Sequence, residues 1–95
     1  MTVASRAGLF MSGEFLGTEL EPDRPSKDDP TKVYPGRFKV KLLVGDRVYQ
    51  VEYPNEDEAL SRIGIGGWPE RGDGLTVNVG VRSAKGFTFY FGRSE

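Results

Sequence analysis

Two alternating segments separated by a two-residue turn constrain the fold of this chain more than any other feature. In residues 37–44 (RFKVKLLV) and 47–53 (RVYQVEY), apolar and polar side chains alternate, as they do in a strand with one buried face. Gly45 and Asp46 lie between them, and glycine at the first turn position favours a type II′ hairpin. The sequence therefore predicts an antiparallel hairpin. The turn fixes its register and pairs Val44 with Arg47, Leu42 with Tyr49, Val40 with Val51 and Phe38 with Tyr53 on the core face.

Two further segments are predicted to be strands before and after this hairpin. Residues 9–20 (LFMSGEFLGTEL) are rich in apolar side chains and are interrupted by Gly13 and Gly17. This pattern favours a long strand that bends or bulges at its glycines. Residues 75–82 follow a glycine-rich loop at 65–74 and alternate between apolar and polar side chains, so they are predicted to be a half-buried strand.

The last strand is expected at residues 87–91 (FTFYF), after a turn at 83–86. Alternation gives this segment two faces, and we assign its three phenylalanines, Phe87, Phe89 and Phe91, to the core and Tyr90 to the outside. Residues 85–89 (KGFTF) also resemble the start of an RNP1 motif, in which a strand aromatic stacks on a base. The positions that follow depart from that motif, so we interpret the segment as a core strand.

A short helix and a long loop complete the expected layout. Asn55 is a typical N-cap with Glu58 three residues later, the first turn is acidic, and Gly64 ends the segment, so a helix is predicted between the third and fourth strands. Residues 21–35 contain four prolines, which cannot join a strand ladder. We therefore expect a long loop there, and a flexible N-terminus at residues 1–8.

Composition limits the class of protein. The 95 residues suffice for one core, and 12% aromatic residues are too many for a disordered chain. Without cysteine there is no disulfide framework, which fits a cytoplasmic location, and no apolar run approaches the ~18 residues of a membrane span. Because histidine is also absent, Ser-His-Asp and Cys-His catalysis and the usual zinc sites are excluded. We expect no enzyme activity, no catalytic residue, no metal and no cofactor.

The order of strand, long loop, hairpin, short helix and second hairpin resembles the OB-fold over residues 9–93, with its best local points in the first hairpin and in residues 72–79 (GDGLTVNV). The resemblance implies an all-β, five-stranded Greek-key barrel in a single domain, with one short helix between the third and fourth strands. It also implies that oligonucleotides or oligosaccharides bind on the outer face of the second and third strands. In size the chain is similar to the compact single-stranded-DNA-binding proteins of phages and plasmids.

Carried onto this sequence, the resemblance implies a binding face made of cations and exposed rings. The net charge is only −1, yet residues 37–47 carry four bases against one acid. Phosphates need such cations along a groove, and bases stack on exposed aromatic rings. The expected nucleic-acid-binding residues are Arg37, Lys39, Lys41 and Gln50 from the hairpin, Arg82 and Lys85 near the last turn, and the rings of Tyr34, Trp68 and Tyr90.

Each of these residues also has an ordinary structural explanation. Lysine and arginine on the outer face of a hairpin keep that face solvated and its edge unpaired. Trp68 could equally cover one end of the barrel. Leu43 and Val48 point outward together and form a small apolar patch that would serve base stacking or a contact between subunits.

The function expected from the sequence is binding of single-stranded DNA without sequence preference, in replication or transfer of a phage, plasmid or mobile element, with RNA as a further ligand and a homodimer as the assembly. The alternative is a protein-interaction module on the same barrel, which binds no nucleic acid and docks through the acidic, proline-rich loop at 21–35 and the patch of Leu43 and Val48.

Overall fold

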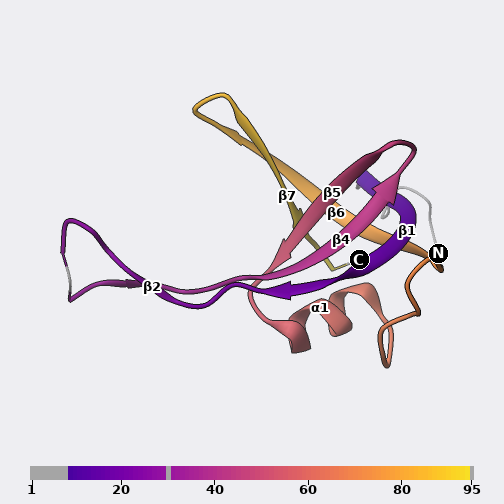
Figure 1. The fold of residues 1–95 in the computed structure, drawn as a ribbon, viewed down its shortest axis with the longest axis horizontal. Coiled ribbons are helices and arrows are strands. Elements are labelled where there is room, and N and C mark those ends of the chain that lie inside the picture. The colour runs from indigo at the N-terminus through magenta and orange to yellow at the C-terminus, as the bar shows by residue number, and fades with distance from the viewer. Residues whose placement is uncertain (1–8, 30, 95) are drawn as a thin grey trace.

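The computed structural model describes residues 9–29 and 31–94, and five of its strands close into a barrel (Figure 1). Around the barrel the order is β1-β4-β5-β7-β6, with β6 pairing back to β1; β5 and β7 run parallel and the other neighbours antiparallel. This confirms the all-β, OB-like barrel expected from the sequence. The expected flexible N-terminus at 1–8 lies outside the described residues. The barrel strands are β1 (Leu9–Leu20), β4 (Phe38–Val44), β5 (Arg47–Tyr53), β6 (Gly74–Ala84) and β7 (Phe87–Gly92).

The β4–β5 hairpin has the predicted register, from the pair Val44 and Arg47 at the turn to the pair Phe38 and Tyr53 at its far end. The predicted irregularity in β1 is also present. Its register against β4 shifts between Phe15 and Gly17, and Gly17 has a φ of 139°, which an L side chain rarely adopts. This bulge bends β1 so that it pairs with β4 and with β6.

One helix, α1 (Glu56–Ile63), lies beneath the barrel in Figure 1, between β5 and β6 in the chain. The Asn55 side chain accepts a hydrogen bond from the Glu58 amide at 2.8 Å, and Gly64 ends the helix in the left-handed conformation at φ 85°. Ala59 packs fully buried against the core. The cap and stop signals read from the sequence therefore position this helix.

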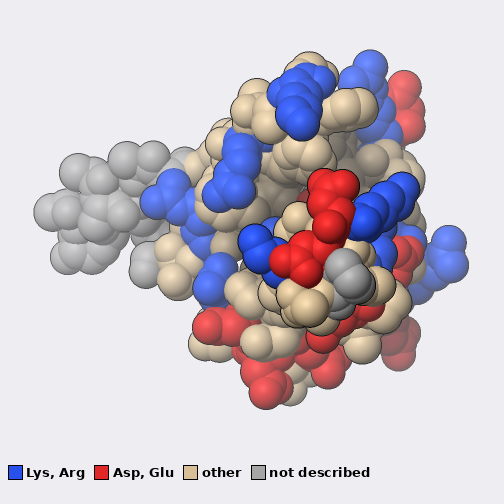
Figure 2. All heavy atoms as spheres, turned by 90° about the vertical axis from the view of Figure 1, so that its left-hand side faces the viewer, with Lys and Arg blue, Asp and Glu red and all other residues tan. Residues whose placement is uncertain are grey.

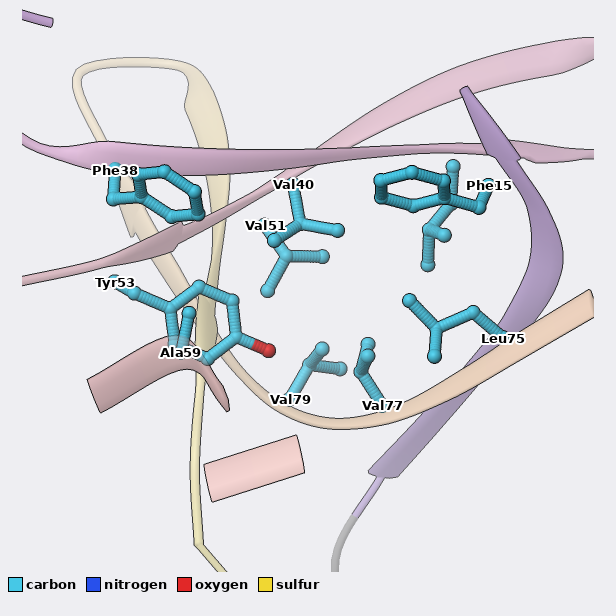
Figure 3. Close-up of a cluster of buried hydrophobic side chains, with 10 residues drawn as sticks. Phe15, Phe38, Val40, Val51, Tyr53, Ala59, Leu75, Val77 and Val79 are labelled. Atoms are coloured by element: carbon cyan, nitrogen blue, oxygen red, sulfur yellow. The ribbon is translucent and has the colours of Figure 1, made fainter. Parts of the chain in front are cut away.

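The core fills the barrel with side chains from the inward faces of the strands (Figure 3). Tyr53 contributes the largest fully buried side chain, and its hydroxyl has no hydrogen-bond partner among the described residues. Burial raises the pKa of this hydroxyl to about 12. The buried cluster consists of Phe15, Phe38, Val40, Leu42, Val51, Tyr53, Ala59, Leu75, Val77 and Val79.

Residues 21–29 and 31–36, which we name the arm, extend away from the barrel on the left of Figure 1. Within the segment predicted to be a loop, two short strands pair antiparallel, β2 (Arg24–Pro25) and β3 (Val33–Tyr34). At the base of the arm, the Gly36 amide donates to Asp23 Oδ1 at 2.6 Å. The arm is thus a narrow ribbon rather than a loop without internal pairing.

The assignment of the two faces of the last strand was wrong. Lys85 and Gly86 both have positive φ, 51° and 82°, and form a two-residue turn that pairs Ala84 with Phe87. This register sets Tyr90 opposite Val81, on the inward parity of β6. Tyr90 therefore packs against the core, with its ring edge-on to that of Tyr49 at 5.5 Å. Phe87, Phe89 and Phe91 lie on the outer face of β7 instead.

Candidate nucleic-acid interface

Three phenylalanines follow one another along the outer face of β7, and we name Phe87, Phe89 and Phe91 the aromatic row. Phe87 is 66% exposed and Phe89 is 42% exposed, although large aromatic side chains are usually buried in a small domain. Their ring centroids are 6.4 Å apart and the ring planes are inclined by 42°. The row begins at the tip of the β6–β7 hairpin, which stands clear of the barrel in Figure 1. Solvent therefore reaches these two rings.

Phe91, the innermost member of the row, is half-buried and holds a cation in place. Its ring packs on the backbone of Gly80, where a Cβ atom would overlap the ring. The guanidinium carbon of Arg82 lies 5.6 Å from the ring centroid, in cation–π geometry. Gly80 and Phe91 thus orient the guanidinium of Arg82, whose residue lies opposite Phe89 on the neighbouring strand.

A groove of about 440 Å³ lies beside the row, and we name it the arginine groove. It contains three arginines against one carboxylate, and its volume lies within the range of small-ligand sites. Figure 2 shows the side of the molecule that carries the arm, with Lys and Arg over much of the upper part, Asp and Glu over most of the lower part, and an acidic group at the centre. The groove is therefore locally positive in a chain of net charge −1. Its lining residues are Arg37, Glu52, Tyr53, Pro54, Arg62, Arg82, Ala84, Phe89 and Phe91.

The three arginines of the groove differ in their partners. Arg62 reaches from α1 to β7, where its Nη1 donates to the Gly92 carbonyl oxygen at 2.9 Å, and its Nε lies 3.4 Å from Glu58 Oε2. Arg37 Nε lies 3.2 Å from Glu52 Oε1. Among residues 9–29 and 31–94, no carboxylate lies within ion-pair distance of Arg82. Arg82 is thus the arginine of the groove that a phosphate reaches without displacing a carboxylate.

The two predicted lysines of β4 lie on its outer face but each is paired with a carboxylate. Lys39 Nζ lies 3.0 Å from Glu21 Oε2, and Lys41 Nζ lies 2.8 Å from Glu19 Oε1. The hydrogen bond and charge of Lys41 lower the pKa of Glu19 below its ordinary value, and those of Lys39 do the same for the pKa of Glu21. Together with the pair of Arg37 and Glu52, these contacts offset the positive charge that the sequence concentrates on this face.

Trp68 lies within the packed end of the barrel. Its ring stacks on Phe15 at 5.7 Å and on Phe38 at 5.6 Å between centroids, and its indole nitrogen donates to Glu56 Oε2 at 2.9 Å. The structural explanation for Trp68 therefore holds. Tyr90 also packs against the core, and so neither of these two predicted rings lies free on the outer face of the barrel.

The remaining predicted residues occupy separate places. Tyr34 is 62% exposed but belongs to β3 in the arm. Lys85 lies in the hairpin turn immediately before Phe87. Gln50 lines a second hollow of about 320 Å³ together with Lys39, Val48 and Phe89. Of the predicted set, six residues are thus near the aromatic row or line the hollows beside it, namely Arg37, Lys39, Gln50, Arg82, Lys85 and Tyr90.

Among the arginines of the groove and the members of the aromatic row, the sequence analysis did not select four residues, namely Arg62, Phe87, Phe89 and Phe91. A signal for the row was present in the sequence. Treating Lys85 and Gly86 as a two-residue turn, as was done for Gly45 and Asp46, sets Tyr90 inward and the phenylalanines outward. The sequence contains no such signal for Arg62, because its place beside the groove depends on how α1 packs against the barrel.

The described residues contain no group of three or more His, Cys, Asp or Glu side chains arranged to hold a metal ion. Of the helices within those residues, none has the length and apolar character needed to span a bilayer. Comparison of the chain with protein-family models, with curated proteins and with solved structures finds no match.

Proposed function

We propose that this protein binds single-stranded DNA without sequence preference, through the aromatic row and the arginine groove. The observation that carries the proposal is the exposure of Phe87 and Phe89 beside a groove lined by three arginines. Proteins that bind single strands without sequence preference combine rings on which bases stack with cations that follow the backbone. Both elements meet on one side of this barrel.

The chemistry of the two parts is complementary. A phenylalanine ring can stack on any base, because every base has a π face, so the row holds a strand without reading the hydrogen-bonding edges of its bases. The planar guanidinium of Arg82 can donate two parallel hydrogen bonds to a phosphate, and Phe91 already orients it. Neutralising phosphates releases counterions from the DNA, so the affinity should fall as the salt concentration rises.

The proposed site differs in position from the one expected from the sequence. The lysines of β4 are paired with Glu19 of β1 and with Glu21, which directly follows β1, so the outer face of β4 presents less positive charge than its composition indicates. The support for DNA binding therefore comes from β7 and the groove beside it. Arg82, expected from the sequence, belongs to both versions of the site.

Fluorescence anisotropy with a labelled oligothymidine, repeated across salt concentrations, tests the proposal. Phe89→Ala should weaken binding roughly 5- to 100-fold, the cost of one lost base stack. Leu20→Ala is the matched control, because Leu20 is 73% exposed at the end of β1 and does not line the groove. Undetectable binding of the unaltered protein at low salt, or equal affinity of both variants, would reject the proposal.

A second candidate function, docking on a protein partner, is favoured by the arm. Val33 and Tyr34 are 57% and 62% exposed on a ribbon that projects from the barrel. A partner captured from a nuclease-treated lysate by the unaltered chain should be lost with the variant Val33→Ser/Tyr34→Ser. Capture that persists in this variant would contradict docking through the arm.

A further inference from the structure

We infer that the aromatic row selects an extended, unstacked strand. The protein therefore binds thymidine-rich DNA more tightly than adenosine-rich DNA, through the cost of unstacking the bases and without reading their hydrogen-bonding edges. The inference rests on the proposed function and specifies the conformation of its ligand. It comes from the spacing and orientation of Phe87, Phe89 and Phe91 on β7.

The spacing of the two exposed rings does not match that of stacked bases. The centroids of Phe87 and Phe89 are 6.4 Å apart, in line with the roughly 6.4–6.8 Å that two residues span along a strand. Successive bases of one strand in a duplex are separated by about 3.4 Å. Two consecutive bases can therefore stack on Phe87 and Phe89 only if the strand is stretched, so that its bases lie about twice as far apart as in a stacked strand.

The orientation of the rings excludes a different arrangement, in which one base is held between them. The planes of Phe87 and Phe89 are inclined by 42°, so they do not form a parallel slot for a single flat base. Each ring presents its own exposed face. The row therefore offers two separate stacking positions.

The inner end of the row differs from its two outer positions. Gly80 lies against the Phe91 ring, and the guanidinium of Arg82 lies over it. This position therefore offers a cation to the strand rather than another open ring. A strand with bases on Phe87 and Phe89 would meet Arg82 as it continues toward the groove, where its phosphate has a donor.

The cost of stretching the strand decides which DNA binds best. Bases that stack strongly on one another, such as runs of adenine, must give up that stacking before they reach separate rings, whereas runs of thymine give up little. Bases in a duplex must also break their pairing before they can stack on a protein ring. The spacing of the row thus favours oligothymidine, then oligoadenosine, then duplex.

Competition anisotropy with dodecamers of thymidine and adenosine and with a DNA hairpin duplex tests the inference. The unaltered protein should prefer them in that order. Phe87→Ala should bind oligothymidine roughly 5- to 100-fold more weakly, and the difference between oligothymidine and oligoadenosine should be lost because one ring suits a stacked strand equally well. Phe87 is 66% exposed, so this variant should keep the fold, which circular dichroism checks.

Two further variants separate stacking from simple apolar contact. Phe87→Leu keeps an apolar side chain without a π face and should lose the preference for thymidine, as Phe87→Ala does. Leu20→Ala should retain it. Equal affinity of the unaltered protein for the two dodecamers, tighter binding of oligoadenosine, or a preference that survives Phe87→Ala would overturn this inference while leaving the proposed function in place. Failure of every oligonucleotide to bind at low salt would overturn both.

Discussion

Gly80 determines where the Phe91 ring lies on the outer face of the barrel, and with it the guanidinium of Arg82. A Cβ atom at this position would overlap the ring, so Gly80→Ala should push Phe91 outward and move Arg82 away from the groove. We expect a loss of about 1–3 kcal/mol in the free energy of unfolding from overpacking, together with weaker binding of oligothymidine. Urea denaturation and anisotropy measure the two effects.

The control for this substitution is Gly66→Ala, because a Cβ atom at Gly66 meets nothing within 4 Å. It should change the stability and the affinity little. If Gly80→Ala lost stability but bound oligothymidine as tightly as the unaltered protein, the orientation of Arg82 by Phe91 would have no role in binding.

Tyr53 makes the stability of the fold vary with pH in the alkaline range. Its pKa is about 12 in the folded protein against about 10 in an unfolded chain, so between these values the unfolded state has released the proton that the folded state keeps. Stability should therefore fall as the pH rises from about 10 to about 12. Tyr53→Phe should remove this contribution. At neutral pH it should change the stability little, because the hydroxyl has no hydrogen-bond partner within the described part of the chain. Thermal unfolding across the alkaline range checks both, and an unchanged pH slope in Tyr53→Phe would contradict the assignment.

At the scale of elements, the β6–β7 turn determines which side chains of β7 reach solvent. Gly86 has a φ of 82°, and Gly86→Ala should cost about 1 kcal/mol in the hairpin because a left-handed conformation strains an L residue. The tip that carries Phe87 should fray, and the affinity for oligothymidine should fall. Gly45→Ala is the matched control, because Gly45 has a φ of 66° in the turn of the other hairpin, β4–β5, and does not line the groove. Equal affinities of the two variants would show that the turn does not position the row.

The same turn shows which parts of the fold the sequence could predict. The β4–β5 hairpin and α1 were predictable because short-range signals set them, a glycine-first turn in one case and the Asn55 cap with Gly64 in the other. Alternation in β7 identified a strand but not its inner face, since both faces of FTFYF carry an aromatic side chain. Only the register against β6 distinguishes them.

The candidate site was less predictable than the fold because it depends on contacts between distant segments. The pairs of Lys39 with Glu21 and of Lys41 with Glu19 arise when β1 lies beside β4, a neighbour relation that alternation alone does not give. Trp68 lies in a glycine-rich loop, and only the stacking on Phe15 and Phe38 shows that it closes the barrel. Charge runs and exposed rings in a sequence therefore indicate a class of ligand better than they indicate its site.

At the scale of the whole molecule, a net charge of −1 has to be reconciled with a polyanionic ligand. The charges are partly separated in space, with basic side chains over the upper part of the side shown in Figure 2 and acidic ones mainly below. The carboxylates of Glu21 and Glu19 form ion pairs with Lys39 and Lys41 of β4. The molecule therefore holds two cations on the outer face of β4 whose charge is offset by Glu19 of β1 and by Glu21 directly after it.

Glu19→Gln/Glu21→Gln should uncover that charge. The double substitution removes two negative charges, releases Lys39 and Lys41 from ion pairs, and brings positive charge to the side of the sheet that carries Gln50 and Phe89. The affinity for oligothymidine should rise several-fold at low salt. The slope of log affinity against log salt concentration should become steeper, by as much as about two further phosphate contacts would produce. Asp57→Asn/Glu70→Gln is the control, because it changes the net charge equally at exposed positions that do not line the groove. If both double variants strengthened binding to the same extent, the gain would reflect net charge alone, and the bound strand would not reach β4.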